Sequence, residues 1–177
     1  FWSFYWDGTN TVYRYSSNYG VTWSTAAVAF KTTGVDKVSV WYDRSNQIVY
    51  AVGDTSSPSR NVVLQRGVVA PATHTITWAA SDSTFQASLN SAASKNTFIC
   101  KDASGYLWVL SSNLTNPGSP AQYDLSAFQS QAADSISSWR HSANMLDTDS
   151  NLNNVKGVVL PTGSGSSVWT VYGYDGN

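Results

Sequence analysis

A hydroxyl residue followed by Trp recurs along this chain, and this repeat constrains the fold more than any other feature of the 177 residues. The copies are Thr22-Trp23, Thr77-Trp78 and Ser138-Trp139, at intervals of about 60 residues. Short segments in which apolar and polar residues alternate fill each interval, and turns rich in Gly, Asn, Asp and Ser separate them. The chain therefore repeats one unit built of short strands.

A strand–turn–strand pair is the second repeated element. VSVWY, DRSN and IVYAV follow one another over 38–52, and TFICK, DASG and YLWVL follow one another over 97–110. Asp43 and Asp102 begin the two turns. Two further strand-like segments follow each pair, so each unit holds four strands.

Four-stranded units repeated at this interval predict the blades of a β-propeller. The fold class is all-β, in one domain, with units at roughly 1–30, 31–85, 86–145 and 146–177. A β-sandwich is the alternative, because it also contains many short alternating strands. It does not require a Trp at the same place in every fourth strand, and we therefore favour the propeller.

The two ends of the chain occupy the same place in the repeat. FWSFYWDGTN at 1–10 aligns with VWTVYGYDGN at 168–177, and both read as the second strand of a blade. About three blades are expected here, as part of a ring of six to seven blades. We expect the incomplete units to pair with another segment or with a second copy, since unpaired strand edges invite pairing.

The first hydroxyl–Trp pair belongs to a longer motif. The segment SSNYGVTW matches Ser-x-Asp-x-Gly-x-Thr-Trp, with Asn in the Asp position. It resembles the Asp-box, or BNR repeat, of sialidases and related propeller proteins. The resemblance implies a structural turn between the third and fourth strands of a blade, away from the catalytic face. The residues concerned are Ser16, Asn18, Gly20, Thr22 and Trp23.

The Trp residues of the three pairs are expected to hold the blades together. Trp23 would fill the gap between blades, and Trp78 and Trp139 would play the same part in units where the rest of the motif has degenerated. Gly20 would supply a positive φ, and Asn18 would accept hydrogen bonds from local backbone.

Composition excludes several classes of partner. Charged residues make up 12% of the chain and the net charge is -1, so a basic surface for nucleic acid is not expected. No apolar run is long enough for a membrane span. Cys100 is the single cysteine, so no intrachain disulfide can form. The low charge and the many Ser and Thr favour an extracellular or cell-surface protein.

No catalytic residue is assigned from the sequence. Sialidases of this fold use a Tyr nucleophile activated by Glu, and this chain contains no Glu. Asp43 and Asp102 could form a glycosidase pair, but Asp at a turn ordinarily forms the turn. The oxygen-rich segment Asp147–Asn153 lacks the Gly and Glu of a calcium loop, so we expect no metal and no cofactor.

Aromatic residues give the remaining functional hypothesis. Trp41, Trp108 and Arg44 are candidates for binding a glycan or a surface protein, although most Trp and Tyr should fill the core. The favoured function is a non-catalytic extracellular propeller module that binds glycans or proteins or builds a surface assembly. The alternatives are a fragment of a sialidase-like glycoside hydrolase and a structural subunit of a fibre or coat.

Overall fold

The computed structural model describes residues 1–30, 34–55, 62–80, 83–85, 94–116, 122–141 and 156–173. These residues form fourteen strands and no helix, so the expected all-β class is confirmed. No segment among them is a helix long and apolar enough to cross a membrane.

The strands form four antiparallel sheets that follow one another along the chain. The first sheet contains β1 (Trp2–Trp6), β2 (Thr11–Tyr15) and β3 (Ala27–Val28). The second contains β4 (Val35–Asp43), β5 (Ile48–Thr55), β6 (Val62–Ala70) and β7 (Thr75–Trp78), with β8 (Ser83–Phe85) also paired to β6.

The third sheet contains β9 (Ser94–Lys101), β10 (Leu107–Asn116), β11 (Gln122–Ser130) and β12 (Trp139–His141). The fourth is a hairpin of β13 (Lys156–Pro161) and β14 (Val168–Gly173). The second and third sheets run as meanders in which each strand pairs with the next along the chain. Four successive sheets do not fit a two-sheet sandwich, so that alternative is wrong.

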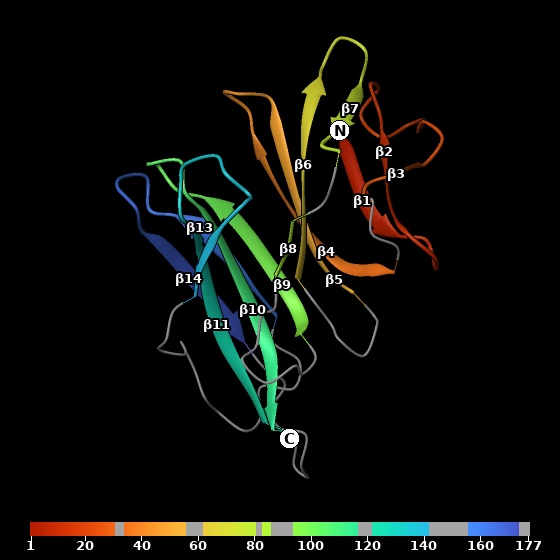
Figure 1. Ribbon diagram of the computed structural model, residues 1–177. Coiled ribbons are helices and arrows are strands. Elements are labelled where there is room, and N and C mark those ends of the chain that lie inside the picture. The colour runs from red at the N-terminus through yellow and green to blue at the C-terminus, as the bar shows by residue number, and fades with distance from the viewer. Residues whose placement is uncertain are drawn as a thin grey trace.

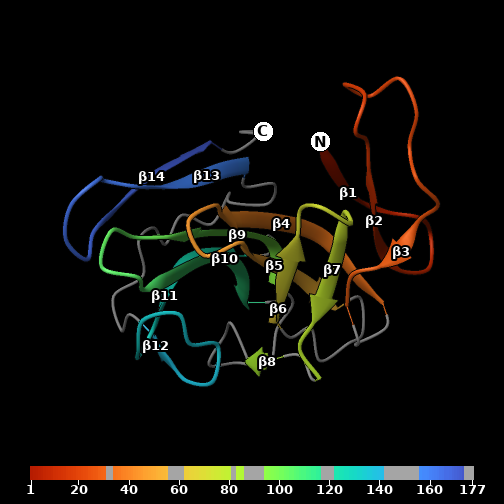
Figure 2. The same ribbon diagram turned by 90° about the horizontal axis from the view of Figure 1, so that it is seen from above.

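The sheets stack face to face in chain order, like blades (Figure 1; Figure 2). The first strand of each sheet makes most of these contacts: β4 lies between β1 and β9, and β9 lies between β4 and β13. Because side chains alternate between the two faces of a strand, each inner sheet presents one apolar face to the sheet before it and one to the sheet after it.

Three apolar interfaces result. The first interface joins the first and second sheets and includes Trp2, Phe4, Tyr13, Val49, Ala51, Val63, Ile76 and Trp78. The second interface joins the second and third sheets and includes Ile48, Tyr50, Val52, Val62, Leu64, Ile99, Leu107, Val109 and Phe128. The third interface joins the third sheet to the hairpin and includes Phe98, Cys100, Trp108, Leu110, Leu125, Val159, Val168 and Tyr172.

In the second and third sheets, the turns that join the first to the second strand and the third to the fourth strand lie at one end of the stack, uppermost in Figure 1. They include the turns between β4 and β5, between β9 and β10, and between β11 and β12. The antiparallel meander therefore brings Asp43, Asp102 and Asp134 to the same end of two neighbouring sheets.

Candidate functional site

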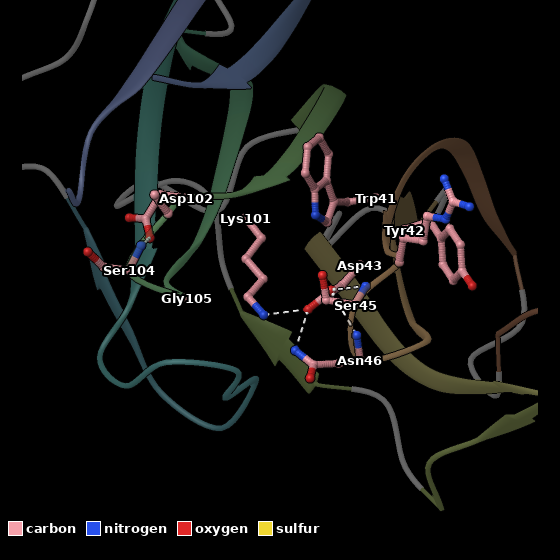
Figure 3. Close-up of a pocket in the computed structure, with 11 residues that line it drawn as sticks. Trp41, Tyr42, Asp43, Ser45, Asn46, Lys101, Asp102, Ser104 and Gly105 are labelled. Atoms are coloured by element: carbon pink, nitrogen blue, oxygen red, sulfur yellow. Dashed lines mark hydrogen bonds and ion pairs between the residues drawn. The ribbon is translucent and has the colours of Figure 1, made fainter. Parts of the chain in front are cut away.

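A cavity of about 490 Å³ lies between the β4–β5 turn and the β9–β10 turn. We call it the turn cleft. Its walls are residues 41–46 from the second sheet and residues 101–105 from the third. Figure 3 shows the two turns facing one another with Lys101 between them. The cleft therefore lies between equivalent turns of two stacked sheets.

Asp43 ends β4 and organises the first wall. Its Oδ1 accepts hydrogen bonds from the backbone N–H groups of Ser45 at 3.0 Å and Asn46 at 3.2 Å. Its Oδ2 accepts one from Asn46 Nδ2 at 2.8 Å and one from Lys101 Nζ at 2.5 Å. Burial acts to raise the pKa of Asp43, but these hydrogen bonds from Lys101 and Asn46 outweigh it and lower the pKa to about 2.

Lys101 ties the two sheets together across the cleft. Its ammonium group lies 2.5 Å from Asp43 in the second sheet and 2.5 Å from Asp134 in the β11–β12 turn. Burial acts to lower the pKa of Lys101, but the two carboxylates raise it above its usual value. The hydroxyl of the fully buried Tyr50 donates to Asp134 at 3.1 Å and extends the network into the second interface.

Asp102 organises the second wall and is buried. Its Oδ1 accepts hydrogen bonds from the backbone N–H groups of Ser104 and Tyr106, both at 2.9 Å. Its Oδ2 accepts one from Trp108 Nε1 at 2.8 Å. Gly105 completes the turn at a φ of +91°, which favours glycine. Asp102 and Asp43 both hold a turn in shape.

The candidate glycan-binding residues do not all meet. Trp41 and Arg44 line the turn cleft, where Trp41 is half-buried and Arg44 is exposed. Trp108 does not line it: its ring packs in the third interface, and only its indole N–H reaches the second wall, through Asp102. The polar side chains of Ser45, Asn46 and Ser104 complete the surface.

The two carboxylates of the cleft are engaged in holding its turns. The oxygens of Asp43 and Asp102 accept seven hydrogen bonds between them. The low pKa of Asp43 keeps it ionised and so unable to donate a proton at neutral pH. Among the residues that the structure describes, no group of three His, Cys, Asp or Glu could hold a metal ion. The segment Asp147–Asn153 lies outside the described residues.

Cys100 is fully buried in the third interface. Burial, and after it the charge of Asp102, raises the pKa of its thiol to about 12. The thiol is therefore protonated at neutral pH and packs as a small apolar side chain.

The segment from Ser16 to Trp23 connects β2 to β3 and forms a hydrogen-bonded loop. Asn18 Oδ1 accepts from the Thr22 backbone N–H and from the Ser16 hydroxyl, both at 2.9 Å, and Asn18 Nδ2 donates to Thr22 Oγ1 at 2.9 Å. Ser16 Oγ accepts from the Gly20 N–H at 2.8 Å. Gly20 has a φ of +87°. The side chains of the motif thus bond to one another and hold the loop.

The three repeated Trp residues occupy different environments. Trp78 packs in the first interface, and Trp139 packs against the second. Trp23 is 42% exposed and joins none of the three interfaces, so the expectation that it fills a gap between blades is wrong. The physical reason is its position: Trp78 and Trp139 lie in strands, whereas Trp23 precedes the two-residue strand β3.

Substitutions of Asn18 test whether its hydrogen bonds in the loop from Ser16 to Trp23 stabilise the protein. We expect Asn18→Ala to lower the free energy of unfolding by about 0.5–1.5 kcal/mol, because the loop loses the hydrogen bonds that the Asn18 side chain makes. Asn18→Asp should preserve stability, because a carboxylate accepts the same hydrogen bonds. Thermal unfolding followed by circular dichroism measures both. Equal melting temperatures for the Ala variant and the wild type would contradict the structural role.

Sequence reasoning identified Asp43 and Asp102 as equivalent turn residues but missed the network of Lys101, Asp134 and Tyr50. Lys101 and Asp43 lie 58 residues apart, and Tyr50 and Asp134 lie 84 apart. A signal was nevertheless present. Equivalent turns of adjacent blades lie at the same end of the stack, so a Lys next to one turn Asp can reach the other.

Comparison with known proteins supports the fold. No family model matches this chain, and no curated protein matches it. Among the solved structures that do match is the endo-arabinase from Bacteroides thetaiotaomicron VPI-5482, with a TM-score of 0.52 and 13% sequence identity. The alignment covers 94% of this chain and 70% of that chain. The neighbour is a propeller protein, and the predicted propeller class is confirmed for this chain.

Proposed function

We propose that this protein is a non-catalytic, extracellular β-propeller module that binds a neutral glycan in the turn cleft. The observation that carries the proposal is the composition of the cleft walls, which are lined by the half-buried Trp41 and by the side chains of Asn46, Ser45 and Ser104. Sugar rings combine apolar C–H faces with many hydroxyl groups. An aromatic ring in the same cleft as amide and hydroxyl groups matches both.

The charges of the cleft favour a neutral ligand. Lys101 is neutralised by Asp43 and Asp134 and points at Asp43 in Figure 3. The exposed guanidinium of Arg44 can donate hydrogen bonds to sugar hydroxyls. The cleft volume of about 490 Å³ is within the usual range for small-ligand sites, roughly 300–1,000 Å³.

The loop from Ser16 to Trp23 supports the proposal that this chain is an Asp-box propeller. Its side chains bond to one another and to the backbone of the loop, as a structural turn requires, and Asn18 takes the position of the Asp. We propose that it is a variant Asp-box.

A glycoside hydrolase acting on an arabinose polymer is the second candidate. The similarity to an endo-arabinase favours it, at the level of fold alone. The cleft itself favours binding, because its two carboxylates hold turns.

Affinity electrophoresis of the full chain through gels containing arabinan, xylan, galactan or dextran tests the proposal. Retardation by one of these neutral polysaccharides is expected. Arg44→Ala and Trp41→Ala should each weaken retardation at least tenfold. Trp6→Ala, at a 37% exposed Trp on β1 in the first sheet, is the matched control and should leave it unchanged.

Incubation of the same polysaccharides with the protein, followed by a reducing-end assay, distinguishes the two candidates. Binding without new reducing ends supports the binding module. New reducing ends from arabinan would favour the hydrolase. Retardation that Arg44→Ala and Trp41→Ala leave intact, with both variants folded by circular dichroism, would refute the assignment to the turn cleft.

A further inference from the structure

The hairpin of β13 and β14 has two apolar faces, and the structure covers one of them. Val159, Val168 and Tyr172 face the third sheet and belong to the third interface. The opposite face carries Val158 and Leu160 from β13 and Trp169 and Val171 from β14. Their exposed fractions are 43%, 44%, 66% and 60%. We call these four residues the outer hairpin face.

The four side chains form one continuous surface. Leu160 pairs directly with Trp169, and Val158 pairs directly with Val171, so the side chains meet across the two strands. Residues 157–173 contain no charged side chain. Exposed strands normally carry charges that prevent association, and contiguous apolar surface marks an interaction site.

The outer hairpin face corresponds to surfaces that are buried elsewhere in the same chain. In the third sheet, Trp108 of the second strand pairs with Cys100 of the first strand. In the hairpin, Trp169 of the second strand pairs with Leu160 of the first strand in the same way. Trp108 and Cys100 are covered by the hairpin in the third interface. In the second sheet, Trp41 pairs with Tyr50, and both pack in the second interface. Each sheet thus offers this face to the next one in the stack.

The first sheet, at the other end of the stack, also has a face turned away from its neighbour. Trp2, Phe4 and Tyr13 face the second sheet, so Ser3, Tyr5 and Arg14 lie on the face turned away from it. The guanidinium of Arg14 lies 6.0 Å from the ring centre of Tyr5. Figure 2 shows the first sheet and the hairpin at opposite ends of the stack. In this structure the two surfaces therefore lie apart.

We propose that the outer hairpin face of one molecule packs on the Ser3–Tyr5–Arg14 face of a second copy, and that the reciprocal contact forms at the same time. Two identical contacts related by a two-fold axis close the pair and leave neither surface exposed. The proposal is independent of glycan binding. The occupant is a second copy because this chain carries both surfaces and the contact continues the stacking that its own sheets already use.

Light scattering coupled to size-exclusion chromatography of the full chain gives the first test. We expect a particle of twice 19.2 kDa at micromolar concentration. The double variant Leu160→Lys/Trp169→Lys should be a folded particle of 19.2 kDa, because it removes the two apolar side chains that pair at the centre of the contact and places two further cations against Arg14. Val68→Lys, at a 48% exposed position on β6, is the matched control and should remain dimeric. If the double variant does not fold, Trp169→Ser replaces it.

A mixing experiment tests which surfaces meet. Ser3→Lys places a second cation beside Arg14, with which Ser3 pairs, and should also give a monomer. When the Ser3→Lys and Leu160→Lys/Trp169→Lys chains are mixed, one of the two contacts is intact, and a mixed dimer should form at least tenfold more readily than either variant alone. A monomeric wild-type chain overturns the proposal. So does a Ser3→Lys chain as dimeric as wild type, which would indicate hairpin packing on hairpin.

Discussion

Replacing Lys101 with Met should destabilise the protein by about 1.5–3 kcal/mol at neutral pH, the range for hydrogen bonds to charged groups. The side chain of Lys101 is 12% exposed and that of Asp43 is 9% exposed. Removing the ammonium leaves Asp43 and Asp134 facing the cleft without a cation, while Met keeps the length of the side chain. Lys101→Arg, which keeps the charge, is the control and should lose less stability.

The loss should depend on pH. Because the pKa of Asp43 is about 2 in the folded protein, against 3.8 for an unperturbed Asp, its stabilising contribution is present above pH 4 and disappears as the pH falls toward 2. The difference in stability between wild type and Lys101→Met should therefore be largest above pH 4 and shrink below it. Urea unfolding at several pH values measures it. A difference that stays constant from pH 7 to pH 2.5 would contradict the ion pair.

Replacing Leu64 with Ala should cost about 2–5 kcal/mol, the usual range for a buried Leu. Leu64 is fully buried on β6, pairs with Val52 of β5 and belongs to the second interface. Because packed sheets hold the second interface on both sides, the surrounding residues cannot move in to fill the cavity that the Leu side chain leaves. Val68→Ala, on the same strand but 48% exposed, should cost less than half as much.

Urea unfolding of both variants, followed by circular dichroism and by Trp fluorescence, gives the two free energies. A single transition is expected by both probes, because the second interface joins two whole sheets. Similar losses for Leu64→Ala and Val68→Ala would mean that the second interface does not hold the stack together.

The sequence predicted the sheets well because their information is local. The alternating residues within VSVWY and within IVYAV predicted β4 and β5, and the turn residues between the two segments predicted the turn that joins them. The recurrence of the pattern then predicted stacking of similar sheets. The predicted burial of Trp23 was wrong. The motif around it matched, but the burial of this Trp depends on whether a strand begins at the Trp itself or several residues later.

The site was only partly predictable. Asp43 and Asp102 are the turn formers that their positions indicated. The reach of Lys101 to Asp43, in contrast, depends on how far apart two stacked sheets place their turns, which no local pattern records. The same is true of the exposure of Trp169: its strand reads like the strand of Trp108, and only the arrangement of the sheets distinguishes the covered ring from the uncovered one.

Nuclear magnetic resonance of the indole N–H groups tests the glycan-binding cleft most directly. The eight Trp side chains give separate probes in one spectrum of the ¹⁵N-labelled chain. On titration with oligosaccharides of the polysaccharide that retards the protein, the signals of Trp41 and of Trp108, whose N–H donates to Asp102 in the cleft wall, should shift. Those of Trp6, Trp23 and Trp169 should stay in place. Shifts confined to these three, with Trp41 and Trp108 unmoved, would contradict the account.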